Sequence, residues 1–198
     1  MLIAFVFLVV TRCVVQDYAA IGMLEFTSIA AGIEASDKMV KAADITTLFM
    51  KTVCPGKFLT AISGDVAAVD TSVRVGCQAC PEAIADWFVI PNIHPDVVAA
   101  LSGCSKLQEQ NALGVIETFS AASAVLAADA AAKTASVQLM DVRTALGLGG
   151  KGYVLLTGDV GAVQAAVQAG ADLASEKALL VGVAVLPRPD ASLFEQLM

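Results

Sequence analysis

The sequence contains two related copies of one segment. Residues 20–26, with the sequence AIGMLEF, return at residues 112–118 as ALGVIET, 92 positions later. The Gly-Asp-Val segment at residues 64–66 returns at residues 158–160, 94 positions later. Self-similarity of this kind indicates a repeated structural unit, and about 90 residues are enough for a small domain. The change in spacing predicts that one loop is two residues longer in the second copy.

The composition limits the partners of this chain. Its 12 basic and 19 acidic residues give a net charge of −7, whereas nucleic acids and anionic membranes bind clustered lysine and arginine. We therefore expect neither as a partner. The mean hydropathy is +0.75, but we find no apolar run as long as a membrane helix requires. Because only 16% of residues are charged, we expect much of the surface to lie in subunit contacts.

The N-terminal segment precedes the first copy. Residues 2–10 are apolar, but no basic residue comes before them and Arg12 comes after them, which is the reverse of the order in a signal peptide. We interpret residues 1–18 as an appendage. The chain has five cysteines. An odd number without a signal peptide favours free thiols in the cytosol.

Both copies have the same predicted order of strands and helices. Short apolar runs indicate buried strands, while Ser, Thr or Asp before an apolar periodic segment indicates a helix start. In the first copy these signals predict strands at 20–26, 45–53, 58–63 and 84–90, a helix from Thr27 or Ser28 to about residue 43 with Ile29, Ile33 and Val40 near helical spacing, a helix capped by Asp65, and a short helix after Pro95. In the second copy they predict strands at 113–118, 137–143, 152–157 and 178–186, a helix at 121–135, and a helix capped by Asp159.

This order predicts an α/β (α+β) fold made of two domains. Each domain follows the split-βαβ arrangement β-α-β-β-α-β. We place the first domain at residues 19–107 and the second at residues 108–198. The first hairpin turn is Cys54-Pro55-Gly56-Lys57, in which proline and glycine suit the two central positions of a type II turn.

The sequence offers little material for an enzyme active site. The only histidine, His94, lies in a loop between prolines, and no G-x-S-x-G segment supplies a serine nucleophile. Gly147, Gly149 and Gly150 precede Lys151, but Gly152 stands where a phosphate loop needs Ser or Thr. We expect a hairpin tip there and no catalytic residue in the chain.

Two further pairs of residues leave alternatives open. Cys77-x-x-Cys80 is a single pair, whereas a structural zinc site needs two such pairs; buried apolar cysteines are the alternative. Glu25 and Glu117 lie within apolar strands, where a carboxylate requires a partner or an interface. They are either a catalytic pair or, as equivalent positions in the two copies, structural residues.

Several segments resemble the bacterial microcompartment shell domain. They are residues 22–43, the Gly-Asp-Val-x-Ala-Val segments at 64–69 and 158–163, and Leu186-Pro187-Arg188-Pro189. The resemblance covers about residues 19–198. Two such domains in tandem are typical of shell proteins whose trimers imitate the hexamers of single-domain shell proteins. The resemblance implies a homotrimer with pseudohexameric shape, other shell proteins as partners, and a cytoplasmic location in the microcompartment shell.

Residues 51–58, 92–95 and 149–153 extend the resemblance to tandem-domain shell proteins of propanediol-utilisation microcompartments. It implies that Cys54 lies at the trimer axis and holds an iron–sulfur cluster of the 4Fe-4S type. Three chains would then supply three thiolates, and Lys57 and turn N–H groups would help to stabilise the anionic cluster. The pore loops would comprise residues 54–57 together with Gly147, Gly149 and Gly150.

The resemblance also implies a function and a tile edge. The trimer would pass electrons or a cluster across the shell, with encapsulated redox enzymes as further partners. Lys41, Lys133 and Arg188 match edge positions, and we expect His94 in place of Arg188 in the first copy. One alternative is a metal-free metabolite pore. Another is a ferredoxin-like small-molecule sensor or enzyme, which would have a discrete ligand cleft and would not tile.

Overall fold

The computed structural model describes residues 19–105, 111–145 and 147–197. The interpretation of residues 1–18 as an appendage lies outside these residues. The first domain contains β1 (Ala20–Phe26), α1 (Ile29–Ala42), β2 (Thr46–Val53), β3 (Lys57–Gly64), α2 (Val66–Ala79), a 3₁₀ turn (Pro81–Ala83), β4 (Ile84–Pro91) and α3 (Pro95–Leu101). The second contains β5 (Ala112–Thr118), α4 (Ala121–Thr134), β6 (Gln138–Thr144), β7 (Gly152–Gly158), α5 (Val160–Glu176), β8 (Leu180–Leu186) and α6 (Ala191–Leu197).

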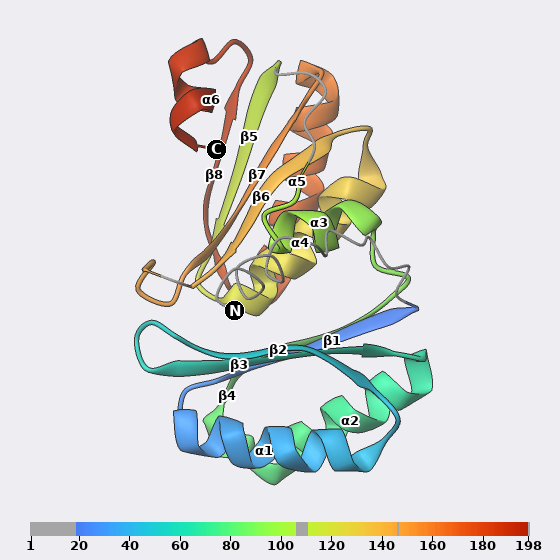
Figure 1. Cartoon of the computed structure of the whole chain (residues 1–198). Helices are drawn as coiled ribbons and strands as arrows, with labels where there is room; N and C mark the ends of the chain where they lie inside the picture. Colours follow the sequence, from blue (N-terminus) through green and yellow to red (C-terminus); the bar gives the residue numbers. More distant parts are fainter. Residues whose placement is uncertain (1–18, 106–110, 146, 198) are drawn as a thin grey trace, which may run out of the picture.

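Each domain is built on a four-stranded antiparallel sheet (Figure 1). The strand order is β2-β3-β1-β4 in the first domain and β6-β7-β5-β8 in the second. The two orders correspond element by element, so the predicted α/β fold and its internal repeat are confirmed.

Serine side chains cap the first helix of each domain, α1 and α4. Ser28 Oγ accepts a hydrogen bond from the backbone N–H of Ala31 at 3.4 Å, and Ser120 Oγ accepts one from Ser123 at 2.8 Å. These bonds satisfy first-turn N–H groups of α1 and α4, which lack acceptors within the helix. Asp65 and Asp159 occupy the N-cap positions of α2 and α5, as predicted, but neither side chain makes a capping hydrogen bond.

The first sheet is buried on both faces, which explains why the central strand β1 is buried at every residue. On one face, Leu24 and Phe26 of β1 pack in a cluster with residues of α1 and α2, among them Met39 and Val73. On the other face, Met23 belongs to a cluster that also contains residues of α4. The alternation follows from the two-residue period of a strand.

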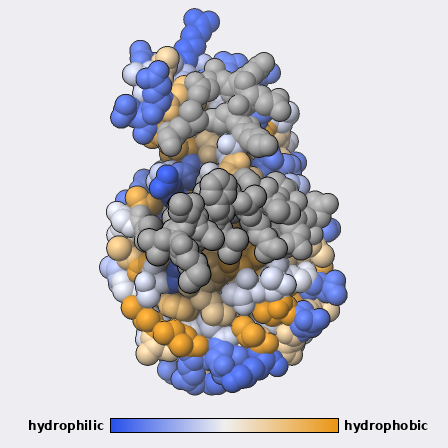
Figure 2. All heavy atoms as spheres, in the orientation of Figure 1, coloured by the Kyte–Doolittle hydropathy of each residue, from blue (hydrophilic) through white to orange (hydrophobic). Residues whose placement is uncertain are grey.

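The helix α1 buries three small residues and Met39, and it exposes three other large apolar residues. Its buried positions are Gly32, Ala35, Ser36 and Met39. By contrast Ile29, Ile33 and Val40 are 37%, 56% and 43% exposed. The predicted helix is confirmed, but its apolar periodicity marks an outward face. Figure 2 shows hydrophobic residues at the surface of the lower half of the molecule, which is the first domain in Figure 1.

The two domains are joined by a packed interface, which we call the in-chain joint. In it, the face of the first sheet opposite α1 and α2 packs against α4, and α3 packs against β6 and α4 (Figure 1). One buried cluster spans it, containing Met23, Phe88 and Ile90 of the first domain and Ala122 and Val125 of the second. On the far side of the second domain, α6 lies along the sheet, where Phe194 packs with Leu113, Met140 and Leu155.

Candidate functional site

Two hairpin loops, one from each domain, lie side by side (Figure 1). The β2–β3 loop contains Cys54, Pro55 and Gly56, and the β6–β7 loop is described from Gly147 to Gly150. A Cβ atom on Gly150 would lie 3.0 Å from Cδ of Pro55 and 3.5 Å from the carbonyl oxygen of Cys54. The structure therefore brings together residues from both predicted pore loops.

Strand register confirms the position of the insertion. Thr52 pairs with Phe58 in the first hairpin, and Thr144 pairs with Gly152 in the second, so the second connection is two residues longer. Gly56 has a φ of 79° and Gly150 a φ of 91°, a region in which glycine is favoured. Gly56 thus has the predicted positive φ, while the Cys54–Pro55 peptide bond is cis.

Cys54 presents an exposed free thiol at the tip of its hairpin. Within the described residues, no three His, Cys, Asp or Glu side chains of one chain converge on a point suited to a metal ion. An iron–sulfur cluster normally has four thiolate ligands. The donor set at Cys54 fits such a cluster only when several copies of the chain contribute one thiolate each.

Lys57, at the base of the first loop, pairs with a fully buried carboxylate. Its Nζ lies 2.7 Å from Oε1 of Glu25, which is 0% exposed. Oε2 of the same residue accepts hydrogen bonds from the backbone N–H groups of Ala121 and Ala122, at 2.8 and 3.3 Å. Glu25 therefore caps α4 across the in-chain joint, where the positive end of the helix dipole favours a negative charge. Lys57 and the N-terminus of α4 thus supply the partners that the buried carboxylate of Glu25 requires.

The equivalent pair in the second domain is more open. Glu117 Oε1 lies 3.0 Å from Nζ of Lys151, and the two side chains are 41% and 42% exposed. In the part of the chain that the structure describes, Glu117 makes no hydrogen bond to a helix N-terminus. Glu25 binds a helix N-terminus, which supports a structural role for this residue. The structure does not bring Glu25 and Glu117 together as a catalytic pair would require.

A second buried carboxylate, which the sequence analysis missed, reinforces the in-chain joint. Asp86 accepts hydrogen bonds from the hydroxyl groups of Ser120 and Ser123, the latter at 2.7 Å, and from Nζ of Lys177 at 2.8 Å. Burial acts to raise the pKa of Asp86, but the hydrogen bonds from Lys177, Ser120 and Ser123 outweigh it and lower the pKa below its usual value. A signal was present, because an aspartate interrupts the apolar strand β4.

Two of the residues predicted for the tile edge, Lys41 and Lys133, lie in the last turns of α1 and α4. Lys41 Nζ pairs with Asp37 at 2.6 Å, and Lys133 Nζ pairs with Asp129 at 2.6 Å. Asp129 also accepts a hydrogen bond from the backbone N–H of His94 at 2.8 Å. The structure thus brings Lys133 and His94 together through one carboxylate.

Strand register assigns a different counterpart to Arg188. Ile90 pairs with Ile21 as Leu186 pairs with Leu113, so Arg188 corresponds to Asn92. His94 corresponds instead to Asp190. Both are N-terminal neighbours of seven-residue helices, and both accept a hydrogen bond from the N–H two residues later.

The other cysteines lie apart from the loops. Cys77 packs against the apolar cluster beneath the first sheet, and burial raises the pKa of its thiol. Cys77 and Cys80 are free, as expected. The expectation of free thiols fails for Cys104, which is disulfide-bonded.

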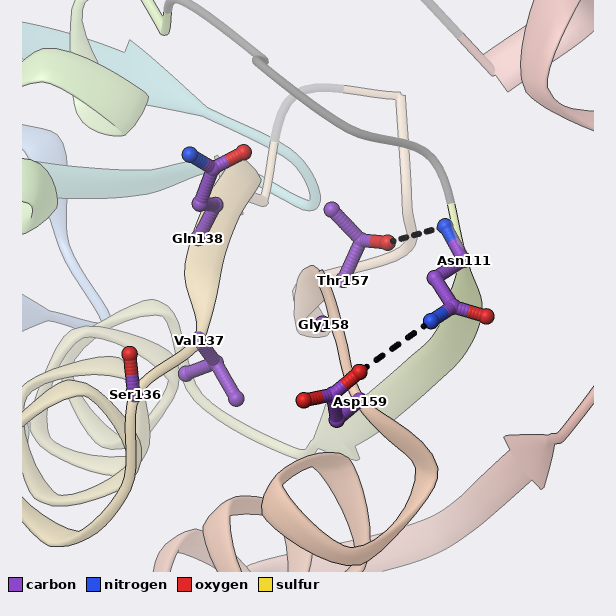
Figure 3. A pocket seen from close by; sticks show the side chains of 7 residues that line it. All are labelled: Asn111, Ser136, Val137, Gln138, Thr157, Gly158 and Asp159. Carbon is purple, nitrogen blue, oxygen red and sulfur yellow. Dashed lines mark hydrogen bonds between the residues drawn. The ribbon is translucent and has the colours of Figure 1, made fainter.

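A polar pocket of about 330 Å³ lies at the opposite end of the second hairpin from its loop (Figure 3). Asn111 bridges its rim, because its backbone N–H donates a hydrogen bond to Thr157 Oγ1 and its side-chain amide donates one to Asp159 Oδ1. The pocket shares no residue with the loops. Elsewhere in the described chain, no helix has the length and apolar character needed to cross a membrane.

Comparison with known proteins identifies the family. The BMC domain matches residues 20–93 and again residues 112–189. The chain is 44% identical over 179 residues to the bacterial microcompartment shell protein PduT of Citrobacter freundii, covering 90% of this chain and 97% of that protein. It is 46% identical over 79 residues to the carboxysome shell protein CsoS1A of Hydrogenovibrio crunogenus, covering 39% of this chain and 81% of that protein.

Solved structures agree with this assignment. A microcompartment protein from Desulfitobacterium hafniense DCB has a TM-score of 0.79 and 49% identity, covering 89% of this chain and 98% of that one. The fused permuted hexameric shell protein MSM0275 of the RMM microcompartment has a TM-score of 0.60 at 20% identity, covering 79% and 81%, and shares the fold. The chain therefore belongs to the bacterial microcompartment shell proteins, as a PduT-like member with two BMC domains in tandem.

Proposed function

We propose that three copies of this chain close into a ring of six domains that forms one tile of a microcompartment shell. Two domains with corresponding elements make each subunit a third of a pseudo-sixfold ring. The observation that carries the proposal is the pairing of the hairpin loops, since a Cβ atom on Gly150 would lie 3.0 Å from Cδ of Pro55 in the other domain. Repeated around a ring, such pairs surround one central opening.

Cys54 is the residue that gives this opening its chemistry. We propose that the three Cys54 thiolates hold one 4Fe-4S cluster, whose fourth iron has a ligand from outside the protein. The exposed thiol at the hairpin tip and the resemblance of its loop support this assignment. When bound, the cluster supplies one-electron transfer, and the tile would then carry electrons or a cluster across the shell, to or from encapsulated redox enzymes.

Other residues of the two loops hold Cys54 in position. Lys57 ties the base of the first hairpin to Glu25 at 2.7 Å, which fixes the hairpin on the sheet. Gly150 allows the second loop to approach Pro55 closely, because a side chain there would meet it at 3.0 Å. The protein thus orients one thiol per subunit, while backbone N–H groups of the turns can face an anionic group.

Iron and acid-labile sulfide measured on anaerobically purified protein test the cluster. Wild-type protein and Cys77→Ser are expected to contain about four irons per three chains, and Cys54→Ser none. Cys77→Ser is the matched control because Cys77 is also a free thiol but packs against the core. Equal iron in Cys54→Ser and wild type would refute the assignment.

A metal-free metabolite pore is the second candidate. The glycine-rich second loop favours it, since Gly147 and Gly149 have open space around them. Wild-type trimers without iron that still tile into sheets would support this candidate. Iron that disappears only in Cys54→Ser would exclude it.

The tile-edge role of Lys41, Lys133 and Arg188 is part of the same proposal, with His94 acting through its bond to Asp129. Electron microscopy of purified protein tests it. Lys133→Asp is expected to abolish extended sheets and leave single trimers. The control is Arg74→Asp, which reverses the charge of an exposed ion pair on α2. Sheets formed by Lys133→Asp as readily as by wild type would contradict the edge role.

A further inference from the structure

Lys51, on β2, differs from the other lysines in its partners. Every other lysine that the structure describes places its Nζ 2.6–3.0 Å from a carboxylate oxygen. Lys51 Nζ instead donates a hydrogen bond to Thr144 Oγ1 at 3.1 Å and lies 4.4 Å from the centre of the Phe49 ring. Its ammonium thus makes no ion pair with any carboxylate in the described part of the chain.

The second domain shows which partner Lys51 lacks. Strand register makes Arg143 the counterpart of Lys51 and Asp141 the counterpart of Phe49. In the second domain Arg143 binds Asp141 through Nε. In the first domain the same two positions hold an amine and an aromatic ring. The carboxylate that would keep the amine protonated has therefore been replaced.

The surroundings of the Lys51 amine are apolar. Phe49 and Val53 flank it on the same face of β2, since side chains alternate along a strand, and Leu59 is its partner on β3. Val53 and Leu59 belong to a buried cluster with Ala145, against which Phe49 packs. Lys51 is half-buried there, and burial lowers the pKa of its ammonium. More of this amine is neutral near pH 7 than of an ordinary lysine.

The charged groups on the neighbouring strands are already paired. Lys57 on β3 lies 2.7 Å from Glu25, and Arg143 on β6 binds Asp141. Lys51 is thus a single amine among apolar side chains and neutralised pairs. A small uncharged compound suits such a place better than a phosphate or carboxylate, which binds where several cations converge.

We propose that the Lys51 amine binds small uncharged aldehydes or ketones reversibly, as an imine. The neutral Nζ attacks the carbonyl carbon, and a proton moves from nitrogen to oxygen to give a carbinolamine. The hydroxyl group then leaves with the remaining nitrogen proton as water, and a C=N double bond forms. Water reverses both steps, and neither step needs an oxidant or a reductant. This inference does not depend on the proposed ring, because Phe49, Lys51 and Thr144 belong to one chain.

Reductive trapping on the full-length protein tests this inference. Acetaldehyde forms the imine, and cyanoborohydride reduces it to a stable ethylamine that peptide mass spectrometry assigns to one lysine. Near pH 7, Lys51 is expected to label at least about threefold faster than Lys41, although Lys51 is half-buried and the side chain of Lys41 is 72% exposed. The midpoint of its pH–rate profile should also lie below that of Lys41. Lys51→Arg keeps the positive charge and should lose this label alone.

A variant at Phe49 gives a second readout. Phe49→Asp supplies Lys51 with the carboxylate that Arg143 has, and an ion pair favours the ammonium. Labelling of Lys51 should therefore slow at least about threefold, while Lys41 labels as before. Phe49→Leu is the matched control, because it also removes the ring but adds no charge, and it should label Lys51 no more slowly than wild type does. Circular dichroism and urea unfolding check that both variants are folded.

Two results would overturn the inference. One is a wild-type chain in which Lys51 labels no faster than Lys41, a comparison that needs no variant to fold. The other is equal labelling of Lys51 in folded Phe49→Asp and Phe49→Leu. In either case the bond from Lys51 to Thr144 would serve only to hold the two domains together.

Discussion

Glu25 is the residue through which the stability of the chain is most directly tested. Its carboxylate is 0% exposed and lies 2.7 Å from Nζ of Lys57. It also accepts two backbone hydrogen bonds from the first turn of α4. Glu25→Gln keeps the shape of the side chain and removes its charge, so the ammonium of Lys57 loses its partner and both N–H bonds lose their charge assistance.

The expected loss follows from the burial of this pair. Breaking a buried ion pair costs about 3–5 kcal/mol. The side chain of Lys57 is 19% exposed, so its ammonium can recover some hydration, and the glutamine oxygen remains a neutral acceptor. We therefore expect about 3 kcal/mol, at the lower end of the range.

Urea unfolding measures this loss. With a slope of about 2 kcal/mol per M, Glu25→Gln should lower the unfolding midpoint by about 1.5 M. Protein concentration must be held constant, since ring formation adds to apparent stability. The control is Asp70→Asn, which breaks the exposed Asp70–Arg74 pair at 2.9 Å and should cost less than about 0.5 kcal/mol. Equal midpoints for the two variants would refute the structural role of Glu25.

Further predictions concern pH, packing and the tile edge. The pKa of Asp86 is lowered in the folded chain from its ordinary 3.8, so its contribution to stability is present above about pH 4 and is lost as the pH falls through the folded pKa. Asp86→Asn should flatten this loss of unfolding free energy, measured by urea titrations between about pH 6 and pH 3. A loss at acid pH equal to that of the wild type would contradict the role of Asp86. Gly170→Ala should lower the thermal midpoint more than Gly76→Ala. The new methyl group would lie 2.7 Å from a carbonyl oxygen of α4 in the first variant and 2.6 Å from a flexible methionine sulfur in the second. Differential scanning calorimetry should show stabilities that differ by about 1–2 kcal/mol, and an equal loss of stability in both variants would contradict this packing. Lys133→Asp should yield trimers that do not form sheets under the electron microscope.

Much of the fold could be predicted because both copies carry the same local signals. The strand at Ala20–Phe26 has the predicted bounds, and the helix at Ala121–Thr134 differs by one residue from its prediction. The helix α6 was missed, since only nine residues follow Pro189 and the helix takes up seven of them. A signal was nevertheless present: Asp190 accepts a hydrogen bond from the N–H of Ser192, and Phe194 supplies the buried contact.

The site was predictable only where residues are close in sequence. The two loops, their two-residue difference and the exposed Cys54 follow from the repeat and from local turn chemistry. The network around Asp86 could not be predicted, because Lys177 lies 91 residues away along the chain. The outward face of α1 was also beyond sequence reasoning, since apolar periodicity shows that a helix has an apolar side but not which neighbour covers it.

A cryo-EM reconstruction of the purified full-length protein tests the central claim most directly. We predict a threefold ring of alternating first and second domains, in which the three Cys54 sulfurs surround the axis. A ring with Cys54 at its outer rim, or particles that are single subunits, would contradict it.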